Sequence, residues 1–475
     1  MRHGGNEVWK SGLRITAAGC LAWIAAVCSG EPARVRVRLD VEGELVASAS
    51  RATEPVRQPI TVSGRFDFVE TPAGDSTDAA VIREYREATA DITVDGKQTE
   101  VILGEDAQRL EIARVGTTAV PYLANGFLTR EEQDLLDIPF DSLLLDALRP
   151  AGVVTIGDTW NVPADIAAGL LAVDTIETGS LEAKLETVSD CVARVLLSGI
   201  IDGAVDGMPT HVVIDGIASI EAAPDISSDS SRLRYRLDGP VSRVTATLRE
   251  RRQASHVAPG FVVEARVAVS RADATLPAES AVAVPSSPSP QPTAVVQQRR
   301  QGDGRPDRLW YHDPGGRFDL VHDSRWRAVE EATGTLVLRM VDRGALVAQC
   351  SITALPPAAA TDPPTIEEVK KDISRSLEGQ FERFAEASAD IRDDGAVVVR
   401  VVSAGTASAL PFRWVHTVLC DETGQRASVA FVMEASMTER FGTADDDLVA
   451  GLRLTAGGGG KGIREARLPR KTATP

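Results

Sequence analysis

Aromatic residues are scarce in this chain of 475 residues, at 4% of its composition. The core must therefore be built mainly from valine, leucine, isoleucine and alanine. Cysteine is scarce as well, and the five cysteines have the spacing of neither a disulfide framework nor a zinc site. Beyond the first 30 residues no apolar stretch reaches 18 residues, so we expect the body of the chain to be soluble.

Motifs of the common enzyme classes are also missing. The chain has no Gly-x-Ser-x-Gly elbow and no His-Glu-x-x-His segment. The glycine run that begins at Gly457 has neither a Ser nor a Thr directly after Lys461, and no strand–helix frame surrounds it, so it does not qualify as a phosphate loop. A hydrolase would need a serine, a histidine and a carboxylate from distant positions to converge in one cleft. We therefore expect a protein that is not an enzyme.

The six histidines contain no pair separated by the three to five residues typical of metal ligands. His312 and His322 lie near three aspartates and form the one zinc candidate, although exposed loops commonly have this composition. These aspartates are Asp313, Asp319 and Asp323. The sequence thus predicts no catalytic, no cofactor-binding and no metal-binding residue, and no cofactor.

What the chain does have is an acidic body. Its formal net charge is −17. The shares of hydrophobic residues, 43%, and of charged residues, 25%, are ordinary for a globular protein. The length of the chain predicts two or three folding units. Residues 1–30 carry a net +2 and residues 457–475 a net +4, which leaves −23 for residues 31–456. So acidic a body repels phosphate backbones, and we expect no nucleic-acid partner.

The N-terminus has the pattern of a signal peptide over residues 1–30. Basic residues precede an uncharged apolar stretch, Ile15–Val27, and small residues follow before Glu31. A single membrane anchor is the alternative, although the stretch is short for a bilayer. A lipid anchor on Cys28 is a further alternative, with Val27 unfavourable just before it. We expect an exported protein, periplasmic or extracellular, which touches a membrane only through the signal peptide or through lipidation of Cys28.

Proline content divides the mature chain. A segment rich in Pro, Ser and Gln at 276–308 is predicted to be an extended linker. It separates a β-rich domain at 33–275 from a second domain at 309–456, and a basic tail follows at 457–475.

The first domain is predicted to be a large antiparallel sheet. Val35–Val41 alternates apolar and charged residues, and Ile60, Val62, Phe66 and Phe68 alternate in the same way. Asp95-Gly96 lies between two apolar runs and predicts a two-residue hairpin turn. Further alternating runs bring the total to about ten strands, enough for a sheet curved into a barrel, half-barrel or sandwich. These runs are 181–188, 193–201, 211–220, 232–237, 241–248 and 261–269.

Leucine-rich helices interrupt these strands. Thr129 and Glu132 have the spacing of a capping box, and Ala164–Val173 predicts another short helix. Such helices beside a curved sheet would either fill its core or close one end of an apolar cavity.

The second domain is predicted to be α+β. Strands at 335–341 and 346–353 precede a second capping box at Thr365–Glu368. An apolar stripe predicts a long helix that reaches Phe384, and strands at 396–402, 412–420 and 426–433 lead to a short helix at 443–453. The stripe consists of Ile366, Val369, Ile373, Leu377, Phe381 and Phe384. Asp445–Asp447 are consecutive helical residues, so they cannot easily converge on one cation.

Two pairs of side chains in the second domain leave alternatives open. Cys350 and Cys420 would form one disulfide in an oxidising compartment, or remain buried thiols on neighbouring strands. Trp310 and Tyr311 would form an exposed recognition patch, or dock the first strand of the domain into its core.

This order of elements, with Trp326 after the first turn, Pro363-Pro364 before the helix and Phe412-Arg413-Trp414 in the following hairpin, resembles the PsbP-like fold. The resemblance implies an antiparallel sheet between helices and a mostly non-catalytic role, as in photosystem subunits, assembly factors and small envelope proteins. Separately, the segment Val153–Trp160 resembles a sequence motif that is common in secreted bacterial β-rich domains of unknown function.

We therefore expect an exported, non-enzymatic, two-domain protein that binds or scaffolds other components of the cell envelope. The alternative is a carrier or sensor that holds a small apolar ligand in the curved sheet of the first domain. Its partner would be an unidentified envelope protein in the first case and an apolar ligand in the second.

Overall fold

The structure is a computed structural model, and it describes ten ranges of the chain. These are 32–47, 56–73, 79–115, 118–205, 208–225, 233–253, 260–274, 305–342, 345–358 and 363–455. The predicted signal peptide with Cys28, most of the predicted linker and the predicted tail lie outside the described residues.

The chain divides into two compact units, each of which consists of three segments. The first unit consists of Met1–Trp310, His322–Val329 and Leu338–Ala348. The second unit consists of Tyr311–Val321, Glu330–Val337 and Gln349–Pro475.

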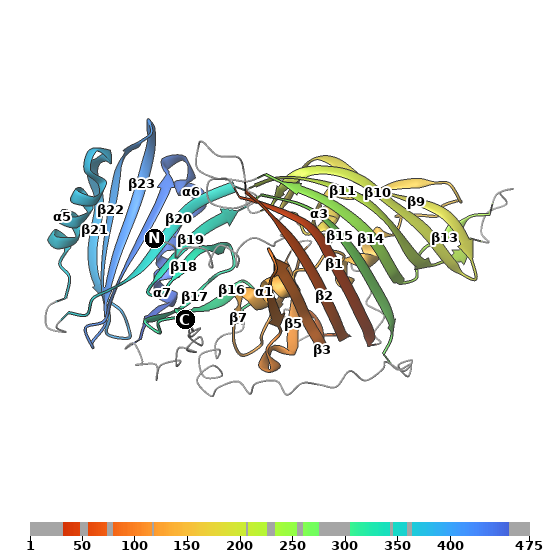
Figure 1. Cartoon of the computed structure of the whole chain (residues 1–475), viewed down its shortest axis with the longest axis horizontal. Coiled ribbons are helices and arrows are strands. Elements are labelled where there is room, and N and C mark those ends of the chain that lie inside the picture. The colour runs from red at the N-terminus through yellow and green to blue at the C-terminus, as the bar shows by residue number, and fades with distance from the viewer. Residues whose placement is uncertain are drawn as a thin grey trace, which may run out of the picture. The chain divides into compact units, whose positions relative to one another are not determined.

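The first unit is built on one antiparallel sheet of twelve strands (Figure 1). Its strands are β1 (Ala33–Ala47), β2 (Val56–Pro72), β3 (Ala79–Val94), β4 (Lys97–Ile102), β5 (Arg109–Val115), β6 (Thr118–Tyr122), β8 (Thr159–Val162), β9 (Thr175–Ser189), β10 (Val192–Val205), β11 (Met208–Glu221), β14 (Val241–Arg252) and β15 (Gly260–Asp273). They pair in the order β6-β5-β3-β2-β1-β15-β14-β11-β10-β9-β8, and β4 pairs with β3 beside this path. The pairing path ends at β6 and β8, so the predicted curved antiparallel sheet is confirmed and it is open.

Sequence alternation sets the two faces of this large sheet. Val35, Val37 and Val41 are buried, whereas the arginines between them are exposed. Asp95 and Gly96 both have positive φ, as a two-residue hairpin turn requires, and they join β3 to β4. One predicted strand is nearly absent, because 232–237 contributes only β13 (Tyr235–Arg236), which pairs with β12 (Ala223–Pro224) outside the large sheet.

Short helices cover the apolar face of the large sheet. They are α1 (Arg130–Leu136), α2 (Ser142–Leu145) and α3 (Ala164–Leu171), with 3-10 turns η1 (Glu105–Ala107) and η2 (Asp146–Leu148). The predicted capping box of α1 is present, because Thr129 accepts from the Glu132 amide and the Glu132 carboxylate accepts from the Thr129 amide. Leucines of these helices belong to the same core cluster as Val35, Phe66 and Phe68, so the helices fill this face of the sheet. Strand β7 (Leu128–Thr129), just before α1, pairs in parallel with β16 (Arg308–His312).

A seven-stranded sheet forms the centre of the second unit. Its strands are β18 (Trp326–Ala332), β19 (Thr335–Asp342), β20 (Ala345–Leu355), β21 (Phe381–Ile391), β22 (Val397–Ala407), β23 (Leu410–Cys420) and β24 (Arg426–Glu434). They follow the order β18-β19-β20-β24-β23-β22-β21. Strands β18, β19 and β20 each contribute residues to both units. The remaining elements are β17 (Phe318–Asp323), paired with β25 (Leu452–Leu454), and α5 (Ile366–Leu377), η3 (Glu378–Gln380), η4 (Ala435–Met437), α6 (Thr438–Phe441) and α7 (Ala444–Gly451).

Helices lie on both faces of this second sheet. On β22, Val399 and Val401 pack against Val369 and Ile373 of α5. Arg400, between them, donates to the carboxylate of Asp445 in α7. Because successive side chains of a strand point to opposite faces, α5 and α7 cover opposite sides of the sheet. No helix within the described ranges has the length and apolar character that crossing a bilayer requires.

The predicted helix that reaches Phe384 extends further than the helix in the structure. Helix α5 begins at its predicted capping box, but it ends at Leu377, and Phe381 and Phe384 lie on β21. Glu378 has a positive φ, which breaks the helical path, and Gly379 follows in the turn η3. The apolar stripe of the sequence continues past this break because side chains of both α5 and β21 pack toward the core.

The cysteines are free thiols within the described part of the chain, with Cys350 and Cys420 buried. The alternative of a disulfide is therefore wrong for this structure. The two thiols do not lie on neighbouring strands either, because β24 separates β20 from β23. Burial raises the pKa of the Cys350 thiol well above its usual value, which keeps the group protonated and inert.

The core of the first unit contains a polar cluster that we call the buried ion network: Glu70, Arg83, Asp141 and Ser142. Arg83 on β3 donates through Nε to Glu70 on β2, over 3.0 Å, and through both terminal nitrogens to Asp141, over 2.6 and 2.8 Å. Ser142, the first residue of α2, donates to Glu70 over 2.8 Å. The network therefore ties two strands of the large sheet to the start of a helix.

The electrostatics of Arg83 show how tightly this network is held. Burial by itself would lower the pKa of the guanidinium, but the attraction of Asp141 and Glu70 outweighs burial and raises the pKa well above its usual value. The guanidinium also lies over the Phe68 ring, 4.9 Å from its centroid. Burial raises the pKa of the neighbouring Tyr85 hydroxyl to about 12.

We predict that Arg83→Met lowers the free energy of unfolding by about 3–5 kcal/mol, because it leaves two buried carboxylates without their cation. Equilibrium urea unfolding of the full chain measures this loss. Arg109→Met is the matched control, because Arg109 forms an exposed ion pair with Glu84 and its removal should cost far less. Equal losses in the two variants would contradict the structural role of the network.

Candidate functional site

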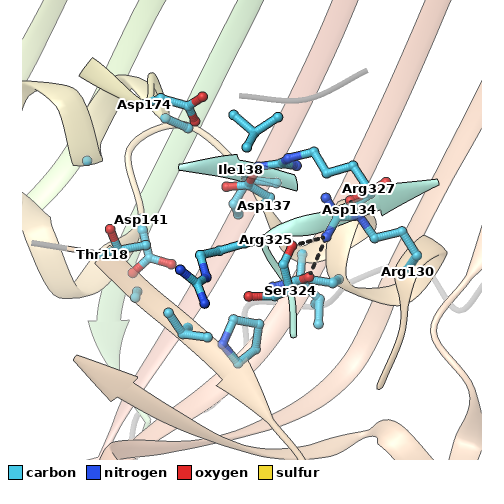
Figure 2. Close-up of a pocket in the computed structure, with 18 of the residues that line it drawn as sticks. Thr118, Arg130, Asp134, Asp137, Ile138, Asp141, Asp174, Ser324, Arg325 and Arg327 are labelled. Carbon is cyan, nitrogen blue, oxygen red and sulfur yellow. Dashed lines mark hydrogen bonds and ion pairs between the residues drawn. The ribbon is translucent and has the colours of Figure 1, made fainter. Parts of the chain in front are cut away.

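The first of two candidate sites is a cavity of about 160 Å³, which we call the charged pocket, and all of its lining residues belong to the first unit. Figure 2 shows guanidinium groups and carboxylates facing one another around it. Its charged lining residues are Arg130, Asp134, Asp137, Asp141, Asp174, Arg325, Arg327 and Asp342. Apolar side chains such as Leu136, Ile138 and Leu144 complete the wall.

Arg130, the first residue of α1, is fixed at one side of the charged pocket. Its Nε lies 3.2 Å from a carboxylate oxygen of Asp134, one helical turn further along. Its NH1 donates to the Ser324 carbonyl over 3.1 Å and to Gln133 over 3.2 Å (Figure 2). The guanidinium is thus committed to groups of the protein.

Other charged groups of the pocket are also engaged. Asp141 is held by Arg83 of the buried ion network, and it also accepts from the Leu143 amide at the start of α2. The Arg325 guanidinium forms two-pronged bonds to Asp323, and this hydrogen bonding raises the pKa of Arg325. The charged pocket therefore has room for a small polar molecule or several waters, and the contacts above account for Arg130, Asp134, Asp141 and Arg325 as parts of the fold.

The second candidate site is a hollow of about 680 Å³, which we call the outer hollow. It lies on the exposed face of the large sheet, opposite the face that the helices cover. The register of the strands determines how the outward-facing side chains of the hollow are arranged. They form two adjacent rows that cross six strands. The first row is Arg38, Ala268, Thr245, Ile217, Leu196 and Lys184, each directly opposite the next. The second row is Asp40, Arg266, Thr247, Asp215, Ser198 and Glu182.

The two rows of the outer hollow differ in chemistry. The first row has basic groups at both ends, Arg38 and Lys184, and apolar Ile217 and Leu196 toward its centre. The second row contains three carboxylates and one arginine. Adjacent rows on one face of a sheet are about 7 Å apart, so a bound segment would meet both charge signs together with an apolar strip.

Some of these charges are already paired. Arg38 donates to Asp40 over 2.8 Å, and this hydrogen bond lowers the pKa of Asp40. Arg249 approaches Asp215 at 3.1 Å. Within the described residues, no ion-pair partner is found for Lys184 or Glu182 at the other end of the hollow, so these two groups are available to a ligand.

The zinc candidate of the sequence is not assembled. His312 Nδ1 lies 2.6 Å from Asp319, whereas His322 Nδ1 lies 2.9 Å from the backbone carbonyl of Asp323. Asp313 accepts from the amides of Arg317 and Gly334, which makes it a turn-forming residue. Nowhere in the ranges that the structure describes do three His, Cys, Asp or Glu side chains gather in a way that would hold a metal ion.

Other residues singled out in the sequence are structural. Asp445 is buried and bonded to Arg400, whereas its neighbour Asp446 is exposed and lies 3.6 Å from the same guanidinium, so these two aspartates pair with an arginine of the fold. Trp310 is buried in the first unit, so it is not part of an exposed recognition patch, whereas Tyr311 is half-buried. Trp326 is buried as well. Trp160 is half-buried, and its indole N–H donates to the Leu148 carbonyl over 2.9 Å.

His416 on β23 is a buried histidine with a shifted titration. Its neighbours across the sheet are Val401 and Ala430, and its Nδ1 is buried without a hydrogen-bond partner. Burial disfavours the charged imidazolium and lowers the pKa to about 4. Ser403, whose side chain lies on the same face of the adjacent strand β22, also has a buried oxygen without a partner.

Comparison with known proteins gives structural neighbours only. No protein-family model matches the chain, and no curated protein matches it. It is similar to the solution structure of cyanobacterial PsbP from Synechocystis sp. PCC 6803, with 14% identity and a TM-score of 0.26, over 31% of this chain and 93% of that one. A PsbP structure is thus among its neighbours, at low coverage.

Two further solved structures are similar to part of the chain. A protein from Bacteroides thetaiotaomicron VPI-5482 has 15% identity and a TM-score of 0.23, over 31% of this chain and 48% of that one. Lipovitellin, in a structure of its lipid–protein interactions, has 7% identity and a TM-score of 0.26, over 53% of this chain and 26% of lipovitellin. None of these likenesses transfers an activity or a partner to this chain.

We predict that the stability of the protein falls as the pH drops from about 6.5 to about 4, because the unfolded chain then binds a proton that buried His416 does not. A shift of this size corresponds to about 3 kcal/mol at the acid end. Urea unfolding at a series of pH values measures the slope.

His416→Gln is the control, because it keeps a polar side chain and removes the titration. Carboxylates with lowered pKa values, such as Asp40, also lose stabilisation toward low pH, so the difference between the two proteins isolates His416. An unchanged slope in His416→Gln would contradict the assignment.

Proposed function

We propose that this chain is an exported, non-enzymatic protein that binds or scaffolds other components of the cell envelope, and that a partner protein docks in the outer hollow. The observation that carries the proposal is the hollow itself, on the exposed face of a sheet whose other face is filled by helices. A sheet covered on one side only leaves a broad, rigid surface on the other.

The chemistry of the outer hollow fits a protein partner. Protein interfaces combine an apolar centre with a polar rim, and their polar groups fix the register of the partner. Here Leu196 and Ile217 provide apolar surface, while Lys184 and Glu182 provide charges of both signs at one end. Ile200, on the same face of β10, is 57% exposed and extends the apolar surface beyond the hollow.

Packing on the other face of the sheet favours a scaffold over a carrier. An apolar ligand in the curved sheet would need space beside residues such as Val35 and Phe68. Both belong to a core cluster with Leu144 and Leu171 of the helices, which occupy that side. The carrier of a small apolar ligand remains the alternative proposal, and lipovitellin, whose structure concerns lipid–protein interactions, is one of the neighbours of the chain.

The remaining parts of the proposal come from the sequence. Export depends on the signal pattern at 1–30, and anchoring depends on Cys28, both outside the described residues. A PsbP-like second domain is supported by the order of its elements, with helices α5 and α7 on opposite faces of an antiparallel sheet. The acidic body argues against a nucleic-acid partner.

We predict that Ile217→Glu weakens partner binding at least about tenfold, because it places a desolvated charge in the apolar part of the hollow. The full chain is purified from its own cell envelope, the partner is identified by native mass spectrometry, and its affinity for wild-type and variant protein is compared. Thr99→Glu is the matched control, because Thr99 is an exposed strand residue on β4 that does not line the hollow.

Two results would contradict the proposal. A partner that binds wild-type and Ile217→Glu equally would dock elsewhere. A small apolar mass that is lost on denaturation, without a protein partner, would favour the carrier.

A further inference from the structure

The open edge of the second sheet is a separate feature, on a different unit from the outer hollow. Strand β21 ends the pairing order of the seven strands, and β22 is its partner on one side. No described strand pairs with its other side. Backbone N–H and C=O groups of alternate residues along that side are therefore available to another chain.

Natural edge strands usually carry devices that prevent pairing, such as bulges, prolines, lysines or very short length. Strand β21 has register shifts only in its first half, between Phe381 and Arg383 and between Phe384 and Glu386. Its second half, Glu386–Ile391, which we call the open edge, pairs with Val397–Val402 without a shift. It contains neither proline nor lysine, and its charged side chains are the acids Glu386 and Asp390.

The side chains of the open edge leave room for a further strand. Ala387, Ser388 and Ala389 are small, and every residue of the open edge is exposed. Ile391 is 76% exposed, the highest value among the exposed large hydrophobic residues described. An added strand would cover this isoleucine together with the two alanines that share its face.

Acidic groups occupy the other face of the open edge. Glu386 and Asp390 are four residues apart, so they point to the same side of the strand. Glu386 accepts from Arg400 and Arg413, whereas Asp390 has no ion-pair partner among the described residues. The charge of this edge therefore favours a basic segment opposite Asp390.

We infer that the open edge accepts an extended, basic segment of a partner protein as an added β-strand. Main-chain hydrogen bonds to alternate residues of Glu386–Ile391 supply affinity, and Lys or Arg side chains opposite the carboxylates supply specificity. Apolar side chains at the intervening positions lie over Ala387, Ala389 and Ile391. This inference does not depend on the proposed function, because it concerns another surface and another mode of binding.

A second copy of this chain fits the open edge less well. In a two-fold antiparallel pairing centred on Ser388, each Glu386 carboxylate lies opposite the Asp390 carboxylate of the other copy. Like charges directly opposite each other destabilise a strand pair. Charge complementarity thus selects a basic partner.

The test uses the full chain and a synthetic octapeptide that alternates valine and lysine, with blocked ends. Hydrogen exchange measured by mass spectrometry should show protection of the segment that contains Glu386–Ile391 when the peptide binds. Two control peptides separate the contributions: one alternates valine and glutamate, and one carries N-methyl groups on alternate backbone nitrogens. Both should bind at least about tenfold more weakly, because the first repels the edge and the second cannot complete the hydrogen bonds.

A charge variant tests the place of binding. Asp390→Lys should weaken the valine–lysine peptide at least about tenfold. Glu330→Lys is the matched control, because Glu330 is an exposed acid on β18, the strand at the other end of the pairing order, and it should leave binding unchanged. Circular dichroism of each variant verifies that the fold is retained.

Three outcomes would overturn the inference. Equal binding of the N-methylated peptide would exclude strand addition. Protection at another segment, or no effect of Asp390→Lys in a folded protein, would place the peptide elsewhere. Protection of the open edge without peptide, rising with protein concentration, would show that a second copy occupies it.

Discussion

The fold of the first unit depends on the buried ion network around Arg83. Arg83 projects from the large sheet into the space where the helices pack, and it neutralises Glu70 on the adjacent strand and Asp141 at the start of α2. Burying three charges is costly, and the cost is offset only when every group finds a partner with good geometry. The network therefore fixes the start of α2 against the large sheet. Arg271 on β15 lies 4.0 Å from Glu70 and extends the network to Asp146 in η2, which also accepts from the Val241 amide.

This constraint connects the core to both surfaces of the sheet. Because the helices are held against one face, that face becomes the core, and the other face stays in water across the width of the sheet. The outer hollow is thus a consequence of the same packing that fills the inner face. The charged pocket lies beside the network, since Asp141 belongs to both.

The second unit has a different kind of open surface. Its sheet is covered by helices on both faces, so its exposed backbone is at an edge rather than on a face. Binding on a face depends on side chains and their charge pattern, whereas binding at an edge depends on main-chain hydrogen bonds. The scaffolding role that we propose would use both kinds of open surface.

Local chemistry determined much of this protein from the sequence alone. Alternation in Val35–Val41 determined which side chains are buried, Asp95-Gly96 determined a turn, and Thr129 and Thr365 determined two helix starts, because each signal acts within a few residues. Tertiary structure decided the rest. The end of α5 at Leu377 depended on a break that apolar spacing does not record. The partners of Arg83 lie 13 and 58 residues away, and the rows of the outer hollow required the register of six strands, so no local pattern revealed them. The edge position of β21 likewise depended on strand order, which long-range pairing sets and composition does not.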